Sequence, residues 1–304
     1  MPARPRTDRR QFLHRAAAAA AAASWPLAVA GVAAESAEKR MKKAVKFGMV
    51  KLDGSVLDKF KLLKELGFDG VELDAPSVLD RDEVLQARDA TGLEIPGVVD
   101  SAHWRDTLSD ADSGVRAKGV EALEAALRDA RLYGATSVLL VPAVVKKDVS
   151  YADAYTRSQA EIRKVLPLAQ ELNVKIALEN VWNNFLLSPL ETARYVDEFD
   201  SPQVAVHFDV GNVVHYGWPE HWIRTLGKRI YKLDIKEFSR AKSEKEGLRK
   251  GFQVELLEGD CDWPAVMAAL REIGYVGWGA AEIPGGGRER LKEIAARMDR
   301  IYAS

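Results

Sequence analysis

Short apolar segments alternate with longer amphipathic ones from Lys42 to the end of the chain. Short segments such as Val174–Leu178 are apolar and contain β-branched residues, which is typical of buried strands. The longer segments repeat apolar residues at helical spacing, and some, like Val56–Leu66, are followed by a glycine. The pattern therefore predicts strands and helices in regular alternation.

The alternation amounts to eight strand–helix units. The predicted strands are Val45–Val50, Gly70–Leu73, Glu94–Val99, Ser137–Val141, Val174–Leu178, Val204–Phe208, Ile230–Ile235 and Gly277–Ala281. The predicted helices are Val56–Leu66, Arg81–Thr91, Gly114–Tyr133, Tyr151–Leu172, Ser188–Phe199, Pro219–Leu226, Asp262–Ile273 and Arg288–Tyr302. Eight units indicate a single-domain (β/α)8 TIM barrel over residues 42–304, with Ser239–Lys250 as an extended loop. A doubly wound sheet is the alternative, but the chain has no GxGxxG or GxxxxGKS/T nucleotide turn.

The first 34 residues have the pattern of a signal peptide rather than of the barrel. Asp8-Arg-Arg-Gln-Phe-Leu-His14 precedes the alanine run Ala16–Ala23, and the paired arginines resemble those of twin-arginine signals, with Asp8 in place of the usual Ser or Thr. The apolar stretch is too short and alanine-rich to favour a permanent membrane anchor. We expect the twin-arginine machinery to export the precursor, leaving residues 35–41 as a flexible mature N-terminus in a periplasmic or otherwise exported protein.

The overall composition excludes several classes of function. The formal net charge is −1 and the sequence pI is about 6.6, so no basic field is present to attract nucleic acid. Cys261 is the single cysteine of the chain, which excludes an internal disulfide and any CxxC site. The 47% hydrophobic content suffices for one large core.

Acidic residues lie at the carboxyl ends of the last four predicted strands: Glu179, Asp209, Asp234 and Glu282. In a parallel barrel these ends meet on one face, where active sites lie. Four converging carboxylates repel one another unless they are protonated or neutralised. A hard divalent cation with oxygen ligands removes this conflict, so the set predicts a site for Mn²⁺ or Mg²⁺. The alternative is that one or two of these acids cap helices or form salt bridges.

Polar and aromatic residues follow other strand ends. Trp182 and Asn183 come soon after Glu179, and we expect them to face a sugar, since indole faces pack on C–H groups and amides bind hydroxyls. His103 follows the third strand and is a further candidate at the barrel mouth.

Strand alternation also predicts a buried polar layer below the mouth. Glu72, His207 and Lys232 point inward if alternate residues face the barrel interior. The same alternation puts Asp234 and Lys236 on one face of the seventh strand.

In these elements the chain resembles the xylose-isomerase-like TIM-barrel superfamily, often called sugar phosphate isomerase/epimerase. The resemblance is carried by the segments Gly67–Leu73, Glu179–Asn180, His207–Asn212, Asp234–Glu237 and Glu282–Gly286. In the ketose 3-epimerases of that superfamily, a Glu, an Asp, a His and a Glu from strands five to eight hold a divalent metal. The two glutamates also move protons on opposite faces of a carbon next to the carbonyl.

The resemblance implies roles for particular residues. Glu179 and Glu282 would be metal ligands and the acid/base pair, and Asp209 a ligand. Two positions depart from the pattern: Asp234 replaces the His of strand seven, and Asn212 replaces a His three residues after the strand-six Asp.

The departures have candidate compensations. Lys232 or Lys236 would balance the added charge of Asp234, and Lys236 is also a candidate substrate contact. His215 lies in the same loop as Asn212 and would supply the missing histidine. Arg240 matches a family arginine that reaches substrate oxygens.

The resemblance implies a metal-dependent sugar isomerase or epimerase that acts on a free ketose or keto-sugar through a metal-stabilised enediolate. One alternative is a lyase or hydratase acting on 3-keto-glycosides, because elimination or hydration follows the same first step. A second alternative is a non-catalytic sugar-binding barrel, supported by the two lost histidines. The expected partner is a small sugar, with no nucleic acid and no membrane for the mature form; the oligomeric state is left open.

Overall fold

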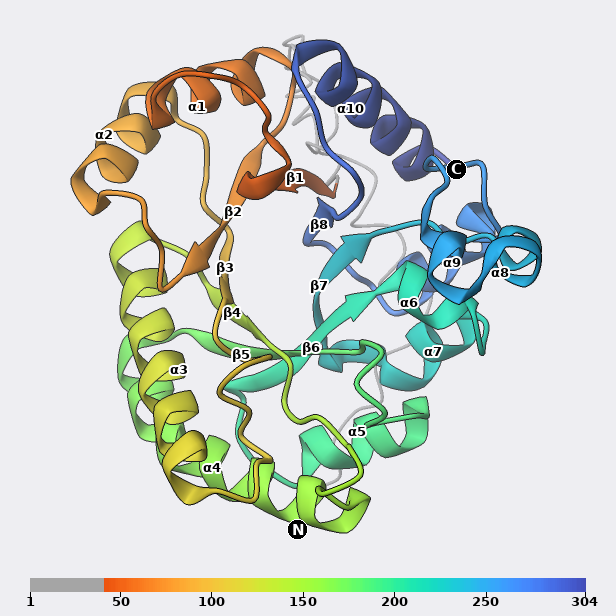
Figure 1. The fold of residues 1–304 in the computed structure, drawn as a ribbon. Coiled ribbons are helices and arrows are strands. Elements are labelled where there is room, and N and C mark those ends of the chain that lie inside the picture. The colour runs from red at the N-terminus through yellow and green to blue at the C-terminus, as the bar shows by residue number, and fades with distance from the viewer. Residues whose placement is uncertain (1–40) are drawn as a thin grey trace, which may run out of the picture. The chain divides into compact units, whose positions relative to one another are not determined.

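Residues 41–304 form a closed barrel of eight parallel strands, surrounded by helices, in the computed structural model, which describes these residues (Figure 1). The strands follow one another around the barrel in sequence order, and β1 pairs with β8 to close it. The TIM barrel prediction is therefore confirmed. The predicted signal peptide lies outside the described residues.

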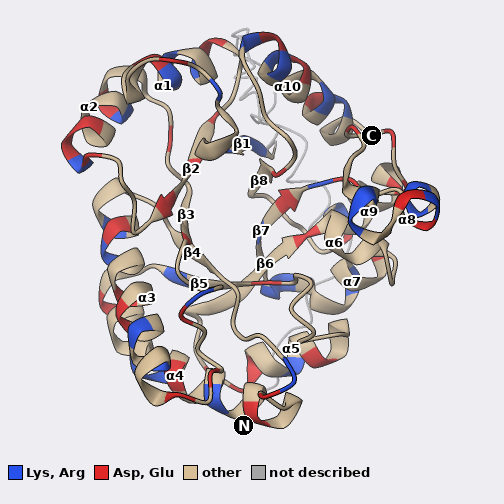
Figure 2. Ribbon diagram, viewed as in Figure 1, with Lys and Arg blue, Asp and Glu red and all other residues tan. Residues whose placement is uncertain are grey.

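The strands are short and the helices vary in length. The strands are β1 Lys42–Lys46, β2 Gly70–Ala75, β3 Gly97–Asp100, β4 Ser137–Leu140, β5 Lys175–Glu179, β6 Val204–Asp209, β7 Ile230–Ile235 and β8 Trp278–Ala281. The helices are α1 Val56–Glu65, α2 Arg81–Thr91, α3 Ser113–Tyr133, α4 Tyr151–Leu172, α5 Pro189–Asp197, α6 Val210–Val214, α7 Pro219–Leu226, α8 Arg240–Glu246, α9 Trp263–Glu272 and α10 Arg288–Tyr302. Figure 2 shows charged residues along the outer helices and also at the ends of central strands.

Local signals in the sequence fix several helix ends. Ser55 and Asp58 form a capping box at the start of α1, and Ser188 accepts a hydrogen bond from the Glu191 N–H at the start of α5. Gly134 ends α3 in the left-handed conformation that glycine adopts without strain.

Two predicted elements need correction. The first strand ends at Lys46, and Phe47–Met49 form a 3-10 turn instead of continuing it. The predicted loop Ser239–Lys250 contains α8 and runs into another 3-10 turn, Leu248–Phe252. Helix α8 is charged along most of its length and therefore gives no apolar stripe, although Ser239 caps it by accepting from the Lys242 N–H.

The apolar core lies mainly between the strands and the surrounding helices, whereas the barrel interior also holds charged side chains. Phe60, Leu123 and Ile294 are examples of fully buried helix residues that face the barrel. Glu72, Lys232 and nearby charged residues are buried as well. Over the described part of the chain, no helix has the length and apolarity that crossing a membrane requires.

Candidate active site

Four carboxylates meet at the carboxyl end of the barrel. Glu179, Asp209, Asp234 and Glu282 each offer an oxygen, and these oxygens all lie within 4.8 Å of one another. Strand register explains the meeting: Asp209 is paired with Asp234 across β6 and β7, and Glu179 with His207 across β5 and β6. Glu282 directly follows β8. The structure thus brings together the four acids that the sequence predicted as ligands.

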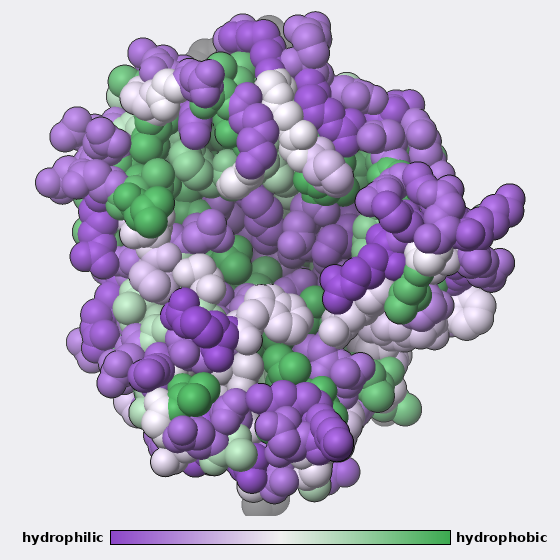
Figure 3. Space-filling model, in the orientation of Figure 1, coloured by the Kyte–Doolittle hydropathy of each residue, from purple (hydrophilic) through white to green (hydrophobic). Residues whose placement is uncertain are grey.

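A cavity of about 660 Å³ opens above this cluster. Its lining includes Trp104, Trp182, Asn212, Lys236, Phe252 and Glu282. Figure 3 shows this face of the molecule, on which the loops that follow the strands surround a hollow. The size is within the range of roughly 300–1,000 Å³ that is usual for small-molecule sites.

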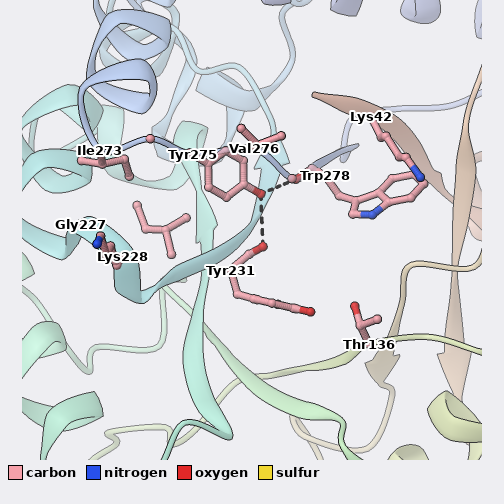
Figure 4. Close-up of a pocket in the computed structure, with 12 residues that line it drawn as sticks. Lys42, Thr136, Gly227, Lys228, Tyr231, Ile273, Tyr275, Val276 and Trp278 are labelled. Atoms are coloured by element: carbon pink, nitrogen blue, oxygen red, sulfur yellow. Dashed lines mark hydrogen bonds between the residues drawn. The ribbon is translucent and has the colours of Figure 1, made fainter. Parts of the chain in front are cut away.

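A second cavity, of about 540 Å³, lies at the opposite, amino-terminal end of the strands (Figure 4). The Tyr275 hydroxyl there donates to the carbonyls of Tyr231 and Trp278, and the Lys42 ammonium lies 4.9 Å from the centre of the Trp278 ring. None of the predicted site residues lines it. We therefore place the candidate active site at the carboxyl end.

Glu179 is buried at the base of the larger cavity. Asn212 Nδ2 donates to its Oε1 at 3.3 Å and also to the Asn180 carbonyl. Burial raises the pKa of Glu179 well above its usual value, and the negative charge of Glu282 adds to the effect. A nearby cation would oppose this shift and favour the ionised form of Glu179.

Asp209 is fixed more tightly than Glu179. Its Oδ1 accepts from the Asn212 backbone N–H at 2.7 Å, so Asp209 caps α6 as well as joining the cluster. The Asn180 side chain bonds both the N–H and the carbonyl of Asp209, at 2.8 Å each. Burial raises the pKa of Asp209 to about 7 even though Lys236 opposes the shift.

Asp234 contacts a lysine and a histidine from below. Its Oδ1 lies 2.8 Å from Lys46 Nζ and 3.0 Å from His207 Nε2. Burial acts to raise the pKa of Asp234, but His207 and Lys46 together lower it. The compensating lysine is thus Lys46 of β1 rather than the predicted Lys232 or Lys236, which pair with other acids.

Lys236 lies inside the carboxylate cluster. Its Nζ is 2.8 Å from Asp209 Oδ2, 2.8 Å from Glu282 Oε2 and 3.4 Å from Asn212 Oδ1. Burial alone would lower its pKa, but Asp209 and Glu282 raise it, so the ammonium stays charged. Asp209 Oδ1 already accepts a hydrogen bond from the Asn212 N–H. Asp209 Oδ2, which Lys236 contacts, is therefore the oxygen that could bind a metal.

A hard divalent cation fits this set of residues. Among the described residues, Asp234 Oδ2 is buried without a hydrogen-bond partner. Asp234 Oδ1 and Glu282 Oε2 also make no hydrogen bond, but they lie in ion pairs with Lys46 and Lys236. Four ionised carboxylates carry four negative charges, and Lys46 and Lys236 return two positive ones. Two negative charges remain, which one divalent ion would neutralise, and an all-oxygen ligand set suits Mg²⁺ or Mn²⁺.

The predicted polar layer lies directly beneath the cluster. Glu72 Oε2 is 2.6 Å from Lys46 Nζ, and Glu72 Oε1 is 3.1 Å from Lys232 Nζ. Burial acts to raise the pKa of Glu72, but Lys46 and Lys232 lower it to about 2. Lys46 bridges this layer to Asp234, so the cluster rests on a paired support.

Three of the remaining predicted contacts have other partners. Asn183 is buried, donates to the Ala143 carbonyl at 2.8 Å and accepts from the Phe185 N–H, so it holds its loop rather than facing the cavity. Arg240 donates to the carbonyls of Val214 and Gly217, both at 2.9 Å. His215 packs against Trp182 and Phe238, with ring centroids at 5.2 and 5.8 Å. None of the three lines the cavity.

The other predicted contacts lie at or near the cluster. Trp182 lines the cavity, and its indole N–H donates to the Asn212 carbonyl at 3.0 Å. His103 is buried and its Nδ1 accepts from the Val141 N–H at 3.2 Å. Burial lowers the pKa of His103 to about 4, with Lys46 contributing, so the ring is neutral at pH 7.

Comparison with known sequences agrees with this geometry. A sequence model of the xylose isomerase-like TIM barrel family matches residues 60–303. The chain belongs to this family. The resemblance inferred from the sequence is thereby confirmed.

Curated relatives in the family include sugar-phosphate epimerases. The chain is 28% identical over 236 residues to L-ribulose-5-phosphate 3-epimerase UlaE of Escherichia coli O1:K1, covering 73% of this chain and 79% of that protein. It is 25% identical over 232 residues to the UlaE of Salmonella paratyphi C (strain RKS4594), with the same coverage.

Solved structures share the fold at lower identity. Apo 3-keto-D-glucoside 4-epimerase YcjR from E. coli superimposes with a TM-score of 0.73 and 17% identity, covering 87% of this chain and 100% of that one. An L-ribulose 3-epimerase has a TM-score of 0.72 and 18% identity, covering 86% and 95%. These likenesses show the barrel fold.

Proposed function

We propose that the protein is a divalent-metal-dependent isomerase or epimerase that acts on a ketose or keto-sugar. The observation that carries the proposal is the cluster of Glu179, Asp209, Asp234 and Glu282. When all four are ionised, their negative charge exceeds the positive charge of Lys46 and Lys236 by two. The sugar epimerases among its curated relatives support the substrate class.

Glu179, Asp209 and Glu282, with Asp234, would hold the cation. When bound, Mn²⁺ or Mg²⁺ would polarise a sugar carbonyl and make the neighbouring C–H more acidic. The protein itself supplies the fixed ligands: Asn180 holds the Asp209 backbone, and Lys46 with His207 orients Asp234.

The two glutamates are the proposed proton carriers. Burial raises the pKa of Glu179, and a carboxylate whose charge a cation balances can accept a proton and return it. Asn212 holds Glu179 through its side-chain amide. Glu282 is the least buried acid of the cluster and lines the cavity. A proton removed by one glutamate and returned by the other to the opposite face inverts a carbon centre; return to the neighbouring carbon isomerises the sugar.

Proton exchange in D₂O tests the proposal. Purified protein with Mn²⁺ and a panel of ketohexoses in D₂O should incorporate deuterium next to the carbonyl, visible by NMR, together with an epimer or isomer of unchanged carbon skeleton. Chelator-treated protein is the control and should show no exchange until Mn²⁺ is restored. Absence of exchange with every ketose and keto-sugar tested, at full metal occupancy, contradicts the proposal.

A lyase or hydratase acting on 3-keto-glycosides is the second candidate. It is favoured by the width of the cavity beyond the acids, which reaches the exposed Trp104. Release of aglycone from a 3-keto-glucoside, with ketoses left unchanged, would establish this reaction in place of epimerisation.

We also propose that the precursor is exported by the twin-arginine route. The support is the sequence Asp8-Arg-Arg-Gln-Phe-Leu-His14 ahead of an alanine-rich stretch. Cell fractionation should find the mature protein in the periplasm, and replacing both arginines by lysine should retain it in the cytoplasm. Equal distribution of the two forms contradicts export by this route.

A further inference from the structure

The cavity extends well beyond the four carboxylates. Of these acids only Glu282 lines it, and its outer wall is built by Trp104, Arg249, Phe252 and Gln253. Three of these residues come from the segment after β7 that the sequence predicted as a plain loop or left unassigned. At about 660 Å³ the space is of a size that encloses drug-sized ligands, which are much larger than one monosaccharide.

The aromatic part of this outer wall is held in place by packing. The Phe252 ring lies 4.9 Å from the ring centres of both Trp182 and Phe238. Gly251 lets the segment approach so closely that a Cβ there would lie 2.3 Å from Phe238 Cε2. The Phe252 ring is therefore a fixed surface rather than a side chain on a loose loop.

Trp104 completes the apolar surface at the mouth. It is 50% exposed, although indoles are usually buried, and it packs edge-on against the buried His103 at 5.7 Å between ring centres. Its indole N–H makes no hydrogen bond within residues 41–304. An exposed, anchored indole is suited to stack on a ring of a ligand.

Arg249 supplies charge at the same rim. Most arginines of the described residues form ion pairs or donate to carbonyls, for example Arg297 with Glu258 and Glu293. The Arg249 side chain lines the cavity but forms no ion pair with the described residues and donates to none of their carbonyls. Its guanidinium therefore remains available for oxygen atoms of a ligand.

We propose that the outer part of the cavity is a subsite for a second ring, so that the substrate is a glycoside with its keto-sugar ring above the carboxylates. The aglycone or second sugar ring lies against Trp104 and Phe252, and Arg249 binds its oxygens. This proposal rests on the proposed sugar-converting function and narrows its substrate class.

Binding of two unreactive probes tests the subsite without turnover. We would titrate Mn²⁺-loaded protein with glucose and with p-nitrophenyl β-D-glucoside by calorimetry. The wild-type protein should bind the aryl glucoside at least ten times more tightly than glucose. Trp104→Ala and Arg249→Met should each reduce that ratio several-fold, and Trp104→Phe should retain most of it.

Matched controls separate the subsite from general effects. Trp218→Ala removes another exposed indole, 57% exposed and outside the cavity, and Lys250→Met removes the charge next to Arg249. Both should keep the wild-type ratio, and all variants should keep the wild-type melting temperature. Equal affinity for the two probes, no binding of the aryl glucoside, or an unchanged ratio in Trp104→Ala and Arg249→Met overturns the proposal.

The outcome is independent of the proposed reaction. Protein that exchanges no protons on any sugar but keeps the Trp104-dependent preference refutes the proposed function and leaves the subsite standing. Protein that turns over free ketoses and shows no preference for the glucoside keeps the function and removes the subsite.

Discussion

The barrel holds two groups of acids, one above the other, in which the pKa values are shifted in opposite directions. In the lower group, Glu72 is in contact with both Lys46 and Lys232, and its pKa is lowered to about 2. In the upper group, burial raises the pKa of Asp209 to about 7 and that of Glu179 well above its usual value. Asp234 lies between them and belongs electrostatically to the lower group, since His207 and Lys46 lower its pKa.

The comparison shows that burial alone does not distinguish a structural acid from a reactive one. Glu72, Asp209 and Glu179 are all buried, so burial disfavours the ionised form of each. In the lower group, Lys46 and Lys232 balance the charges of the acids that they contact, so no further cation is required. Within residues 41–304, the upper group has only Lys236 directly between its members, so it remains short of positive charge. This shortage of positive charge, which the described residues do not fill, points to an external cation.

The largest expected effect comes from neutralising the proton carriers. Glu179→Gln or Glu282→Gln should reduce kcat by roughly 1,000-fold or more, because a carboxamide neither carries the proton nor replaces an anionic ligand. The melting temperature of the metal-free protein should stay close to the wild-type value, since each change removes charge repulsion. Steady-state kinetics measures the loss of kcat, and a thermal melt measures the melting temperature.

Retention of most activity in either glutamine variant would contradict the acid/base assignment. Asp58→Asn serves as a control, since Asp58 lies in the exposed capping box of α1 and only local stability should change.

The second largest effect should come from breaking the lower group. Lys46→Met leaves Glu72 and Asp234 buried with fewer cations, and removing one partner of a buried ion pair costs about 3–5 kcal/mol. Urea unfolding should show this loss in the free energy of unfolding. A matched Lys42→Met change, at a half-exposed ion pair with Glu94, should cost less than about 1 kcal/mol.

An equal cost for the Lys46 and Lys42 variants would mean that the lower group is not held together by its lysine. The Lys46→Met, Glu72→Gln double variant sharpens the measurement, because it removes a cation and an anion together. It should recover part of the stability that the single variant loses.

The fold was predictable because the hydrophobic pattern repeats, and the four acids were predictable because they recur at strand ends. What the sequence did not indicate is which partners polar side chains choose. Lys46 pairs with Asp234 only because closure of the barrel places the end of β1 beside the interior face of β7. Asn183 and Arg240 have the right chemistry for a sugar, but nearby carbonyls compete successfully for their donors.

Helix α8 and the turn after it show a second limit. Arg240–Glu246 has almost no apolar positions, so periodicity gives no helix signal there. The outer cavity wall, with Arg249 and Phe252, follows this helix and was therefore missed. The cap residue Ser239 was the available signal, since its hydroxyl accepts from the Lys242 N–H.

A moderate effect is expected from removing the internal cation of the upper group. Lys236 contacts the same oxygens of Asp209 and Glu282 that a metal would take, so the ammonium and the metal compete. Lys236→Met should therefore bind Mn²⁺ about tenfold more tightly, or roughly 1.4 kcal/mol, by calorimetry. Its metal-free form should melt at a lower temperature than the wild type. Unchanged or weaker Mn²⁺ binding would show that Lys236 supports the metal rather than competing with it.

The smallest expected effect is a difference in pH dependence between the two groups. An Asp whose folded pKa is raised to about 7, against about 3.9 unfolded, stabilises the protein below pH 4 and loses that contribution as the pH rises through 7. Glu72 has a lowered pKa, so its contribution is present above about pH 4 and is lost as the pH falls toward 2.

The metal-free protein should consequently lose a few degrees of melting temperature as the pH rises from about 4 to about 7, and Mn²⁺ should reduce this loss by neutralising the ionised carboxylates. Asp209→Asn should flatten the dependence of melting temperature on pH between about pH 4 and pH 7 and leave the loss of stability below pH 4 unchanged. The loss of stability below about pH 4 depends instead on Glu72. Glu72→Gln should therefore make the melting temperature fall less steeply below pH 4 and leave its change at higher pH unaffected. If one variant altered the melting temperature equally in both pH ranges, the two groups would titrate as one. Lys46 and His207 would then not separate them electrostatically.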